Sequence, residues 1–457
     1  MNLSIAVNLV SVSFFAAIVF TGFLRNLSKK YKFLIDLPDK NRKFHKRPTP
    51  LVGGLGIHFS MLLGMVILFL SVDTKIYDQS NKLTIVNSNL EVENNNTIEK
   101  YKVSASKIDS SLSTSDTFEV RIDGVDPSII VRRNSAGNFE LIAPNGALRE
   151  YVFDNGYLTD LNHGEVIKVS TPSAGSYFSL SPTMAAVIVM SILLQFFMLL
   201  DDISGLSQKN RFVIQSLASF GVIALSGEYI SNIGFGLLGW NGELGYFGVI
   251  FTIFAVTGLI NAFNMIDGIN GLCSGIVLMC LLALIFLGGS STLNYGILIA
   301  TSAVAGFLIY NLGLFGQKRA VFLGDNGSNF LGFFVAWTCI YYSSESINIM
   351  NPVTALWFVA IPLWDCIQLI IQRSYSGKGP FEGDRDHIHH IVFDRTPLKG
   401  YWPLISILFA SSIFCIVGIY LESIQKPIYS IIAFIIFGLF FTYVKQKMSL
   451  WFIHENR

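Results

Sequence analysis

Acidic and amide side chains follow several long apolar stretches of the sequence. An ionised carboxylate at bilayer depth costs on the order of 2.5 to 3.5 kcal/mol, so each such side chain needs a partner or a use. All of these groups fall on the same side of the membrane in the orientation derived below, which predicts one site assembled from helix ends. They are Asp201-Asp202, then Asn261, Asn264 and Asp267, then Asp325, and last Asp384, Arg385, Asp386, His387, His389 and His390.

The types of these side chains favour a diphosphate bound with a hard metal ion. Carboxylate and amide oxygens without a nearby cysteine suit Mg²⁺, with Mn²⁺ as the alternative, and such ions typically use one or two protein ligands plus phosphate oxygens. Zinc would need a tetrahedral set of nitrogen or sulfur ligands, so we expect the three histidines to contact phosphate instead. Cations in the same loops can stabilise the charge of a transferring phosphoryl group; they are Lys46, Arg47, Lys209, Arg373 and Arg385.

Three polar features also have simpler explanations. The adjacent carboxylates Asp201 and Asp202 could form a solvated turn at the membrane interface. His58 lies within an apolar stretch, where we expect a hydrogen-bonding residue of the bundle interior. Asp365 lies about two turns inside its stretch, and it fits either a supporting role at the site or helix packing.

The elements that position these residues are apolar and long enough to cross a membrane. Hydrophobic residues make up 52% of the chain and charged residues only 14%, which is typical of membrane proteins. We predict an all-α polytopic membrane protein with about eleven transmembrane helices, each able to cross roughly 30 Å of hydrocarbon. The stretches lie near residues 4–24, 51–71, 181–200, 211–227, 245–263, 270–289, 293–313, 327–342, 352–372, 401–420 and 427–444.

The basic residues predict the orientation of these helices. If Met1 lies outside, the inside loops and their flanks hold most of the 32 basic residues, whereas the short outside loops hold only Lys426. We therefore expect the amino terminus outside, and the carboxyl terminus and the polar groups in the cytoplasm. The first apolar stretch has its basic cluster after it, so we interpret it as a retained span rather than a signal peptide.

Residues 73–180 differ from the rest of the chain in composition. They are rich in polar residues, and turn signals such as Asn145-Gly146 and Asn155-Gly156 separate short alternating runs. We predict a small β-rich extracytoplasmic insert with a partner-docking or stabilising role, whose partner the sequence does not identify. A direct part in the chemistry is the alternative. The predicted organisation is therefore 1–72 with two helices and a basic cytoplasmic loop, the insert at 73–180, and 181–457 with helices three to eleven and the catalytic loops.

Five polar segments, read together and in order, closely resemble the motifs of the polyprenyl-phosphate N-acetylhexosamine-1-phosphate transferase superfamily. The resemblance covers nearly the whole chain outside residues 73–180. It is closest to the bacterial undecaprenyl-phosphate GlcNAc-1-phosphate transferase branch, of the glycosyltransferase family 4 type. The segments are RKFHKRPTPLVGGLGI (42–57), LLDDISGLSQKNR (199–211), NAFNMIDGINGL (261–272), FLGDNGSNFLGF (322–333) and GPFEGDRDHIHHI (379–391).

The resemblance implies an enzyme of the bacterial inner membrane with its active site in the cytoplasm. It implies transfer of a HexNAc-1-phosphate, with GlcNAc expected, from a UDP-sugar to undecaprenyl phosphate, with release of UMP. This is the first membrane step of a cell-surface polysaccharide such as an O-antigen. Mg²⁺ is the expected cofactor, no nucleic-acid partner is expected, and a homodimer is compatible with the sequence.

The resemblance also implies a role for each matching residue. It assigns Asp201, Asp202 and Asp267 to catalysis, and Asp325 and Asn264 to the metal. Asn270 departs from the bacterial pattern, because many members have a second Asp at that position. The residues expected to bind substrate are Lys46, Asn261, Asn270, Phe322, Arg385, His387, His389 and His390.

Other functions stay open at this point. A muramyl-pentapeptide phosphotransferase of the same superfamily is disfavoured by the HIHH-type loop. A transporter would place its acids near the bilayer midplane, often on repeats, and we find no repeat. A catalytically silent scaffold is the third alternative. For the enzyme, direct displacement and a route through an aspartyl-phosphate are both compatible with the sequence.

Overall fold

The computed structural model describes most of the chain outside residues 73–180. The described residues are 3–38, 47–71, 181–236, 240–289, 294–377, 379, 386–396 and 398–455, together with nine strands between residues 82 and 168. Lys46 and Arg385, both predicted to bind substrate, lie outside this part of the chain. Contacts between Cα atoms divide the chain into two compact units, Met1–Ser71 with Ser181–Arg457, and Val72–Leu180.

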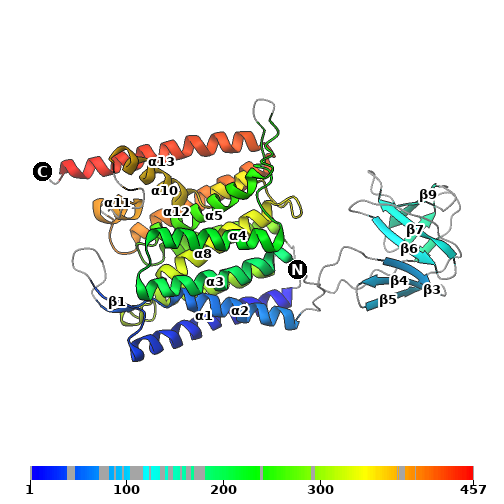
Figure 1. Cartoon of the computed structure of the whole chain (residues 1–457), viewed down its shortest axis with the longest axis horizontal. Coiled ribbons are helices and arrows are strands. Elements are labelled where there is room, and N and C mark those ends of the chain that lie inside the picture. The colour runs from blue at the N-terminus through cyan, green and yellow to red at the C-terminus, as the bar shows by residue number, and fades with distance from the viewer. Residues whose placement is uncertain are drawn as a thin grey trace. The chain divides into compact units, whose positions relative to one another are not determined.

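The first unit is a bundle of helices (Figure 1). A short antiparallel pair, β1 (Ile35–Asp36) and β2 (Thr49–Pro50), lies between its first two helices, and a 3₁₀ turn, η1 (Gln317–Arg319), precedes α8. The helices are α1 (Leu3–Tyr31), α2 (Gly53–Ser71), α3 (Pro182–Ser204), α4 (Gln208–Ser226), α5 (Phe247–Ile266), α6 (Leu272–Gly288), α7 (Asn294–Asn311), α8 (Gly324–Ser343), α9 (Pro352–Phe358), α10 (Ala360–Tyr375), α11 (Ile388–Arg395), α12 (Trp402–Ser423) and α13 (Pro427–Glu455).

The structure supports a multi-pass membrane protein but does not confirm eleven spans. Helices occupy all eleven predicted stretches, yet only seven of the described helices are long and apolar enough to cross a membrane, or eight spans if one bent pair is counted. Helices α4, α6 and α8 are not among the helices that are long and apolar enough to cross a membrane. Helix α6 has 17 residues, and α8 opens with the polar run Gly-Asp-Asn-Gly-Ser-Asn. A helix that other helices surround has less need of apolar residues than one that faces lipid.

The predicted single span at 352–372 is wrong in one respect, because the helix is broken. Helices α9 and α10 meet at Val359 with a bend of 85°. Pro362 lies in the first turn of α10. A proline has no N–H to donate, and its ring clashes with the carbonyl four residues earlier, so a continuous helix through Phe358 is disfavoured.

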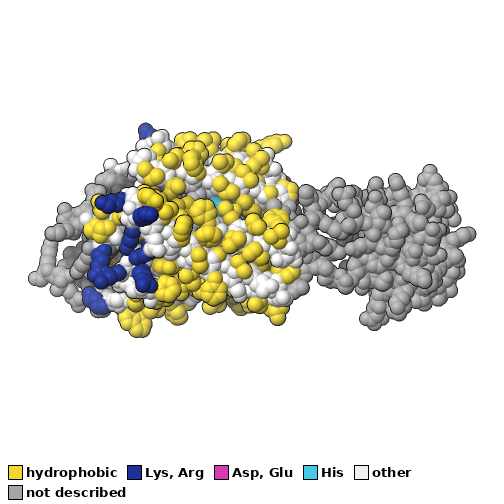
Figure 2. Space-filling view, turned by 90° about the horizontal axis from the view of Figure 1, so that it is seen from below, with side chains coloured by type: hydrophobic (Ala, Val, Ile, Leu, Met, Phe, Trp, Pro, Cys, Tyr) yellow, Lys and Arg dark blue, Asp and Glu magenta, His cyan; other side chains and the backbone are white. Residues whose placement is uncertain are grey.

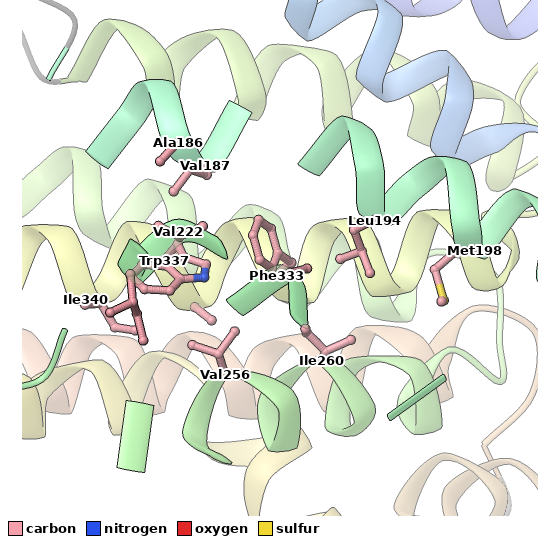
Figure 3. Close-up of a cluster of buried hydrophobic side chains, with 13 residues drawn as sticks. Ala186, Val187, Leu194, Met198, Val222, Val256, Ile260, Phe333, Trp337 and Ile340 are labelled. Atoms are coloured by element: carbon pink, nitrogen blue, oxygen red, sulfur yellow. The ribbon is translucent and has the colours of Figure 1, made fainter. Parts of the chain in front are cut away.

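Helix α8 is the centre of the bundle. It contacts both α3 and α5, and most of its side chains are buried. Figure 3 shows Phe333 and Trp337 of α8 among Leu194 of α3, Val222 of α4 and Ile260 of α5. Each buried side chain of this size contributes about 1.5–3 kcal/mol in water, although packing rather than water exclusion drives the association of helices inside a membrane. This packing fixes where the polar first turn of α8 lies relative to the ends of α3 and α5.

Short capped turns reverse the chain beside the predicted acidic residues. Gly205 ends α3 in the left-handed conformation at φ 68°, and its N–H donates to the Asp201 carbonyl. Ser207 then caps α4, since its hydroxyl accepts from the Asn210 N–H at 3.3 Å. The local sequence after Asp201-Asp202 thus brings α4 back alongside α3.

The face of the bundle shown in Figure 2 is apolar along its length and basic at one end. Phe15, Phe254 and Phe409 are among many large apolar side chains that are more than 60% exposed. Lys29 and Lys30 end α1, and Lys318 and Arg319 lie in η1. A long apolar exterior with cations gathered at one end is typical of a membrane protein.

The second unit contains the predicted β-rich insert. Its nine strands form one sheet in the order β11-β10-β9-β8-β7-β6-β3-β4-β5, and all neighbours are antiparallel except β3 and β6. The strands are β3 (Lys82–Val86), β4 (Asn89–Asn94), β5 (Thr97–Lys102), β6 (Thr117–Ile122), β7 (Val125–Arg133), β8 (Phe139–Ile142), β9 (Leu148–Asp154), β10 (Tyr157–Asp160) and β11 (Val166–Lys168). A mainly helical membrane protein with a small β-rich insert, the predicted fold class, is confirmed.

Candidate active site

A polar pocket opens at the end of the bundle where α3 and α5 finish and α8 begins. It encloses about 2060 Å³, including its open mouth. Seven residues predicted from the sequence line it, namely Asp201, Asp202, Asp267, Asn270, Phe322, Asp325 and His390. The pocket is therefore assembled from segments that are far apart in the chain.

Asp202 holds the beginning of α8. Its carboxylate accepts from the backbone N–H groups of Asp325 and Asn326, both at 3.2 Å. It also accepts from Asn326 Nδ2 at 2.5 Å. A carboxylate is stabilised at a helix N-terminus because the unpaired N–H groups and the helix dipole both favour negative charge. Asp202 thereby fixes the place of Asp325 in the pocket.

Arg211 of α4 lies between two of the carboxylates. Its Nε is 2.7 Å from Asp201 Oδ2, and its Nη1 donates to Asp325 Oδ2 at 2.7 Å. The Asp201 side chain is fully buried, and its other oxygen accepts from the Leu206 N–H at 2.6 Å. One cation therefore balances acids from α3 and α8 in a site that would otherwise concentrate negative charge.

A chain of amides supports Asp325 from behind. Asn264 Nδ2 donates to Asp325 Oδ1 at 3.1 Å. Asn261 does not line the pocket; its Nδ2 donates to Gln215 Oε1 at 2.7 Å, and Gln215 donates to Asn329. Asn329 Nδ2 returns to the Asp325 carbonyl at 2.7 Å. Asn264 thus touches the Asp325 carboxylate directly, whereas Asn261 is linked through two buried amides to the backbone carbonyl of Asp325.

Asp267 carries a proton more readily than an ordinary carboxyl group. Burial, together with the nearby charges of Asp325 and Asp202, raises its pKa to about 8. It follows the last residue of α5 and lines the pocket with Gly268 and Asn270. A cation bound nearby would favour the ionised form, so the charge of Asp267 depends on what occupies the pocket.

The three predicted histidines differ in position. His390 lines the pocket with Phe393 from the same helix, α11. His389 is 1% exposed and packs against Gly268, where an added Cβ would meet its ring at 1.9 Å. Burial, together with the neighbouring His390 and His387, lowers the pKa of His389 to about 3, so the His389 ring is neutral.

His387 lies behind the pocket. Its Nδ1 is 2.8 Å from Asp365 Oδ2, in an almost fully buried contact. Of the three histidines, only His390 lines the pocket itself.

The loop before α8 is held by the start of α2. The N–H groups of Gly53 and Gly54 donate to the carbonyls of Phe322 and Leu323, both at 3.0 Å. A Cβ on Gly54 would lie 2.3 Å from the Gly327 Cα, so a larger residue would separate the two helices. This contact places Phe322 at the wall of the pocket.

The oxygen donors at this site fit a hard divalent cation. Within the described part of the chain, no three His, Cys, Asp or Glu side chains form a ready-made metal cluster. Mg²⁺ keeps waters and phosphate oxygens and uses one or two protein oxygen ligands, so a small set of carboxylate and amide oxygens would be enough to hold it. The Asp325 side chain is 38% exposed and directed toward Arg211, with the Asn264 amide against it, so both predicted metal residues lie together.

Several residues of the site were not predicted. Arg211 has the role expected of a loop cation, whereas Lys209 is exposed outside the pocket and Arg47 lines a different cavity. Gln215, Asn326 and Asn329 complete the amide chain. The available signal was a polar residue at helical spacing within otherwise apolar helices, as at Arg211 and Gln215 of α4. His58, by contrast, lies in the bundle interior as expected, stacked on Phe330 at 4.5 Å.

The sequence of this region is similar to that of known proteins. Residues 184–343 match the family described as glycosyl transferase family 4. The undecaprenyl-phosphate alpha-N-acetylglucosaminyl 1-phosphate transferases of Yersinia pestis and Escherichia coli (strain K12) are 35% and 34% identical to the chain. These alignments cover 50% and 49% of the chain, and 63% and 61% of the relatives, so the chain spans about three fifths of their length.

A relative from Haemophilus influenzae is matched over more of its length. This protein has the same description, and it is 35% identical over 258 residues, which are 55% of the chain and 72% of the relative. The chain therefore belongs to glycosyl transferase family 4, in the branch of the undecaprenyl-phosphate GlcNAc-1-phosphate transferases.

Proposed function

We propose that the chain transfers GlcNAc-1-phosphate from UDP-GlcNAc to undecaprenyl phosphate and releases UMP. The observation that carries this proposal is the convergence of Asp201, Asp202, Asp267 and Asp325 on one pocket at one end of the bundle. The described activity of the relatives supplies the substrate class. As in the sequence-based prediction, the pocket faces the cytoplasm of a bacterial inner membrane, with the amino terminus outside.

In this proposal the bound cation is Mg²⁺, held by Asp325 with Asn264. Such an ion neutralises charge on phosphate oxygens and orients them. The protein positions this pair in three ways: Asp202 fixes the first turn of α8, Arg211 holds the carboxylate, and the amide chain supports its backbone. These contacts arrange charge before substrate arrives, so the site need not reorganise as charge develops in the transition state.

The reaction needs little proton transfer. An oxygen of the lipid phosphate attacks the β-phosphorus of the donor, the bond from that phosphorus to the bridging oxygen breaks, and UMP leaves with the bonding electrons. The second pKa of a phosphomonoester is near 6, so the attacking group is largely ionised at neutral pH. Arg211 is placed to stabilise the phosphoryl oxygens, and Phe322, Asn270 and His390 to contact the donor.

The oxygens of Asp201 and Asp202 already accept hydrogen bonds or face Arg211. This supports a positioning role for the acidic pair and leaves Asp267 as the acid best able to exchange a proton. Trapping a phospho-sugar on the enzyme with donor alone would instead support a covalent route through one of these carboxylates.

The test is an assay of purified protein with undecaprenyl phosphate, Mg²⁺ and a panel of UDP-sugars, in which UMP is measured. We expect UMP release with UDP-GlcNAc and its loss in Asp325→Ala. Glu243→Ala, an exposed acid outside the pocket, is the matched control and should keep full activity. Near-normal activity of Asp325→Ala would remove it from the metal site.

The same panel separates the other functions. Turnover of UDP-MurNAc-pentapeptide but not of UDP-GlcNAc would identify the muramyl-pentapeptide phosphotransferase. Metal-independent flux of substrate across vesicles without UMP would identify a transporter.

A further inference from the structure

A lysine is buried in α13, near the helix that carries the histidines. Lys445 is 2% exposed, and its Nζ donates to Asp365 Oδ1 of α10 at 2.7 Å. An unpaired charge in such a place is strongly unfavourable, so this lysine needs its carboxylate partner. By contrast Lys447, two residues later, is exposed.

Asp365 also holds the start of α11. Its Oδ1 accepts from the Ile388 N–H at 2.9 Å, which is the first amide of that helix. Its Oδ2 contacts His387 Nδ1 at 2.8 Å, and His387 is the residue that precedes the helix. A single carboxylate therefore binds both the backbone and the side chain at the N-terminus of α11.

Lys445 and His387 contact the two oxygens of the same buried carboxylate. An ionised carboxylate only accepts hydrogen bonds, so His387 Nδ1 donates to Asp365 Oδ2. With Lys445 present, the charge of Asp365 is balanced. Without Lys445, Asp365 would lose this counter-ion, and its contacts with the start of α11 would be weakened.

The other end of this arrangement reaches the pocket. The ring of His387 stacks on His389 with centroids 5.5 Å apart, and His389 lies 4.3 Å from the ring of His390. His390 and Phe393 line the pocket from α11. The rotation of this eight-residue helix about its axis therefore decides which side chains face the donor site.

We propose that Lys445 and Asp365 are positioning residues that fix the orientation of α11, and with it His390 and Phe393, from outside the pocket. The structural half of this inference does not depend on the reaction, whereas its kinetic half rests on the proposed function. Neither residue touches the pocket itself.

The test compares Lys445→Met with Lys447→Met in the purified full-length protein. Hydrogen exchange of the α11 amides should be at least tenfold faster in Lys445→Met and unchanged in Lys447→Met, while exchange in α1 to α8 stays the same. If the transferase assay is active, Lys445→Met should lower kcat or raise the donor KM at least tenfold, with the KM for the lipid unchanged.

A double variant shows whether Lys445 acts through Asp365. Asp365→Asn with Lys445→Met removes both charges, and the amide oxygen can still accept from the start of α11. We expect the double variant to be at least threefold more active than Lys445→Met, and its α11 amides to exchange more slowly than those of Lys445→Met. This variant also covers the case in which Lys445→Met does not fold.

Two results would overturn the inference. One is unchanged α11 exchange and unchanged kinetics in Lys445→Met. The other is a uniform rise of exchange over the whole bundle in both Lys445→Met and the double variant, which would mean a general packing role. Altered α11 exchange in a protein that releases no UMP would instead leave the positioning role standing and refute the proposed function.

Discussion

At the scale of single residues, the site depends on one guanidinium that two carboxylates share. Arg211 contacts Asp201, which is fully buried, and Asp325, which faces the pocket. A lysine has one charged nitrogen at the end of a flexible chain and lacks the fork that reaches both acids. The site therefore requires arginine at this position rather than positive charge alone.

We predict that Arg211→Met lowers the rate of UMP release by about 10²-fold or more, the size expected for removing one preorganised charge from a phosphoryl-transfer site. Its melting temperature should also fall, because the buried Asp201 loses its counter-ion. Arg211→Lys should be intermediate, and Lys209→Met, two residues earlier and exposed, should behave like the unmodified protein. Equal activity of Arg211→Met and Lys209→Met would contradict the shared-cation arrangement.

A second prediction concerns Asp267 and pH. Its pKa is raised to about 8 in the folded protein, compared with about 3.8 when unfolded, so the folded state binds the proton more tightly. Stability is therefore lost as pH rises from about 4 to about 8 and then levels off. Asp267→Asn removes this loss, so its melting temperature in metal-free detergent should exceed that of the unmodified protein by a margin that widens from pH 5 to pH 8.

The control for this prediction is Glu243→Gln, an exposed carboxyl group whose margin should not change over that range. Added Mg²⁺ should narrow the margin of Asp267→Asn, because a nearby cation favours the ionised carboxylate. A difference in melting temperature between Asp267→Asn and the unmodified protein that stays constant with pH would show that the pKa of Asp267 is not raised.

Residue types could be predicted further than their contacts. The sidedness of the apolar stretches was enough to expect Asp201, Asp202, Asp267 and Asp325 near one another, and the structure brings them together. The buried partners could not be predicted in this way. Gln215 lies in a stretch predicted to be an apolar span, and Lys445 follows the last predicted span. Their hydrogen-bond partners, Asn261 and Asp365, are 46 and 80 residues away in the chain.

At the scale of elements, the close contact of α2 and α8 holds the loop that carries Phe322. A Cβ on Gly54 would lie 2.3 Å from both Asn326 Oδ1 and the Gly327 Cα, and backbone cannot move aside as a flexible side chain can. The same two helices are joined by the hydrogen bonds from Gly53 and Gly54 to the loop before α8. Glycine is needed here because the backbones of α2 and α8 lie close together, not because the backbone must be flexible.

We predict that Gly54→Ala destabilises the protein by about 1–3 kcal/mol, as overpacking of a tight contact usually does. It should also raise the donor KM, because Phe322 moves with the loop. Gly258→Ala in α5 has open space around it and should instead be neutral or slightly stabilising, since alanine favours helices. Thermal unfolding followed by circular dichroism, together with donor kinetics, decides between the two results.

Hydrophobic length predicted where helices lie but not how each one is built. The length of an apolar stretch gives no information about backbone hydrogen bonds that a proline removes. The break at Val359 was therefore not predicted, although Pro362 is present in the sequence. Helix α11 was expected to be a loop, because eight residues with three histidines nearby have no long apolar stretch. Its stability comes from tertiary contacts such as Asp365, which local patterns do not contain.

At the scale of the whole molecule, the chain separates the pocket from the attachment of the insert. Helices α2 and α3 have their pocket ends at Gly53 and Ser204, and the insert joins their opposite ends, Ser71 and Pro182. At 1.5 Å per residue, α2 alone covers roughly 28 Å. The two junctions are thus about one hydrocarbon thickness from the acidic residues.

We therefore expect that replacing residues 73–180 by a short Gly/Ser linker keeps the rate of UMP release within about twofold. The proteins should be compared at matched amounts in detergent, and the melting temperature should be measured in parallel. A loss of more than tenfold in a linker variant that stays folded would mean that the insert takes part in the reaction.

The contact of the Asp202 carboxylate with the first turn of α8 affects which compounds can inhibit the site. Two main-chain N–H groups at the start of this helix could bind an anion, but both already donate hydrogen bonds to the Asp202 carboxylate. An incoming diphosphate must find its countercharges in side chains and bound cations. Compounds that carry their own positive groups to Asp325 and Asp267 should then compete better than phosphate mimics, and their potency should decline as salt concentration rises.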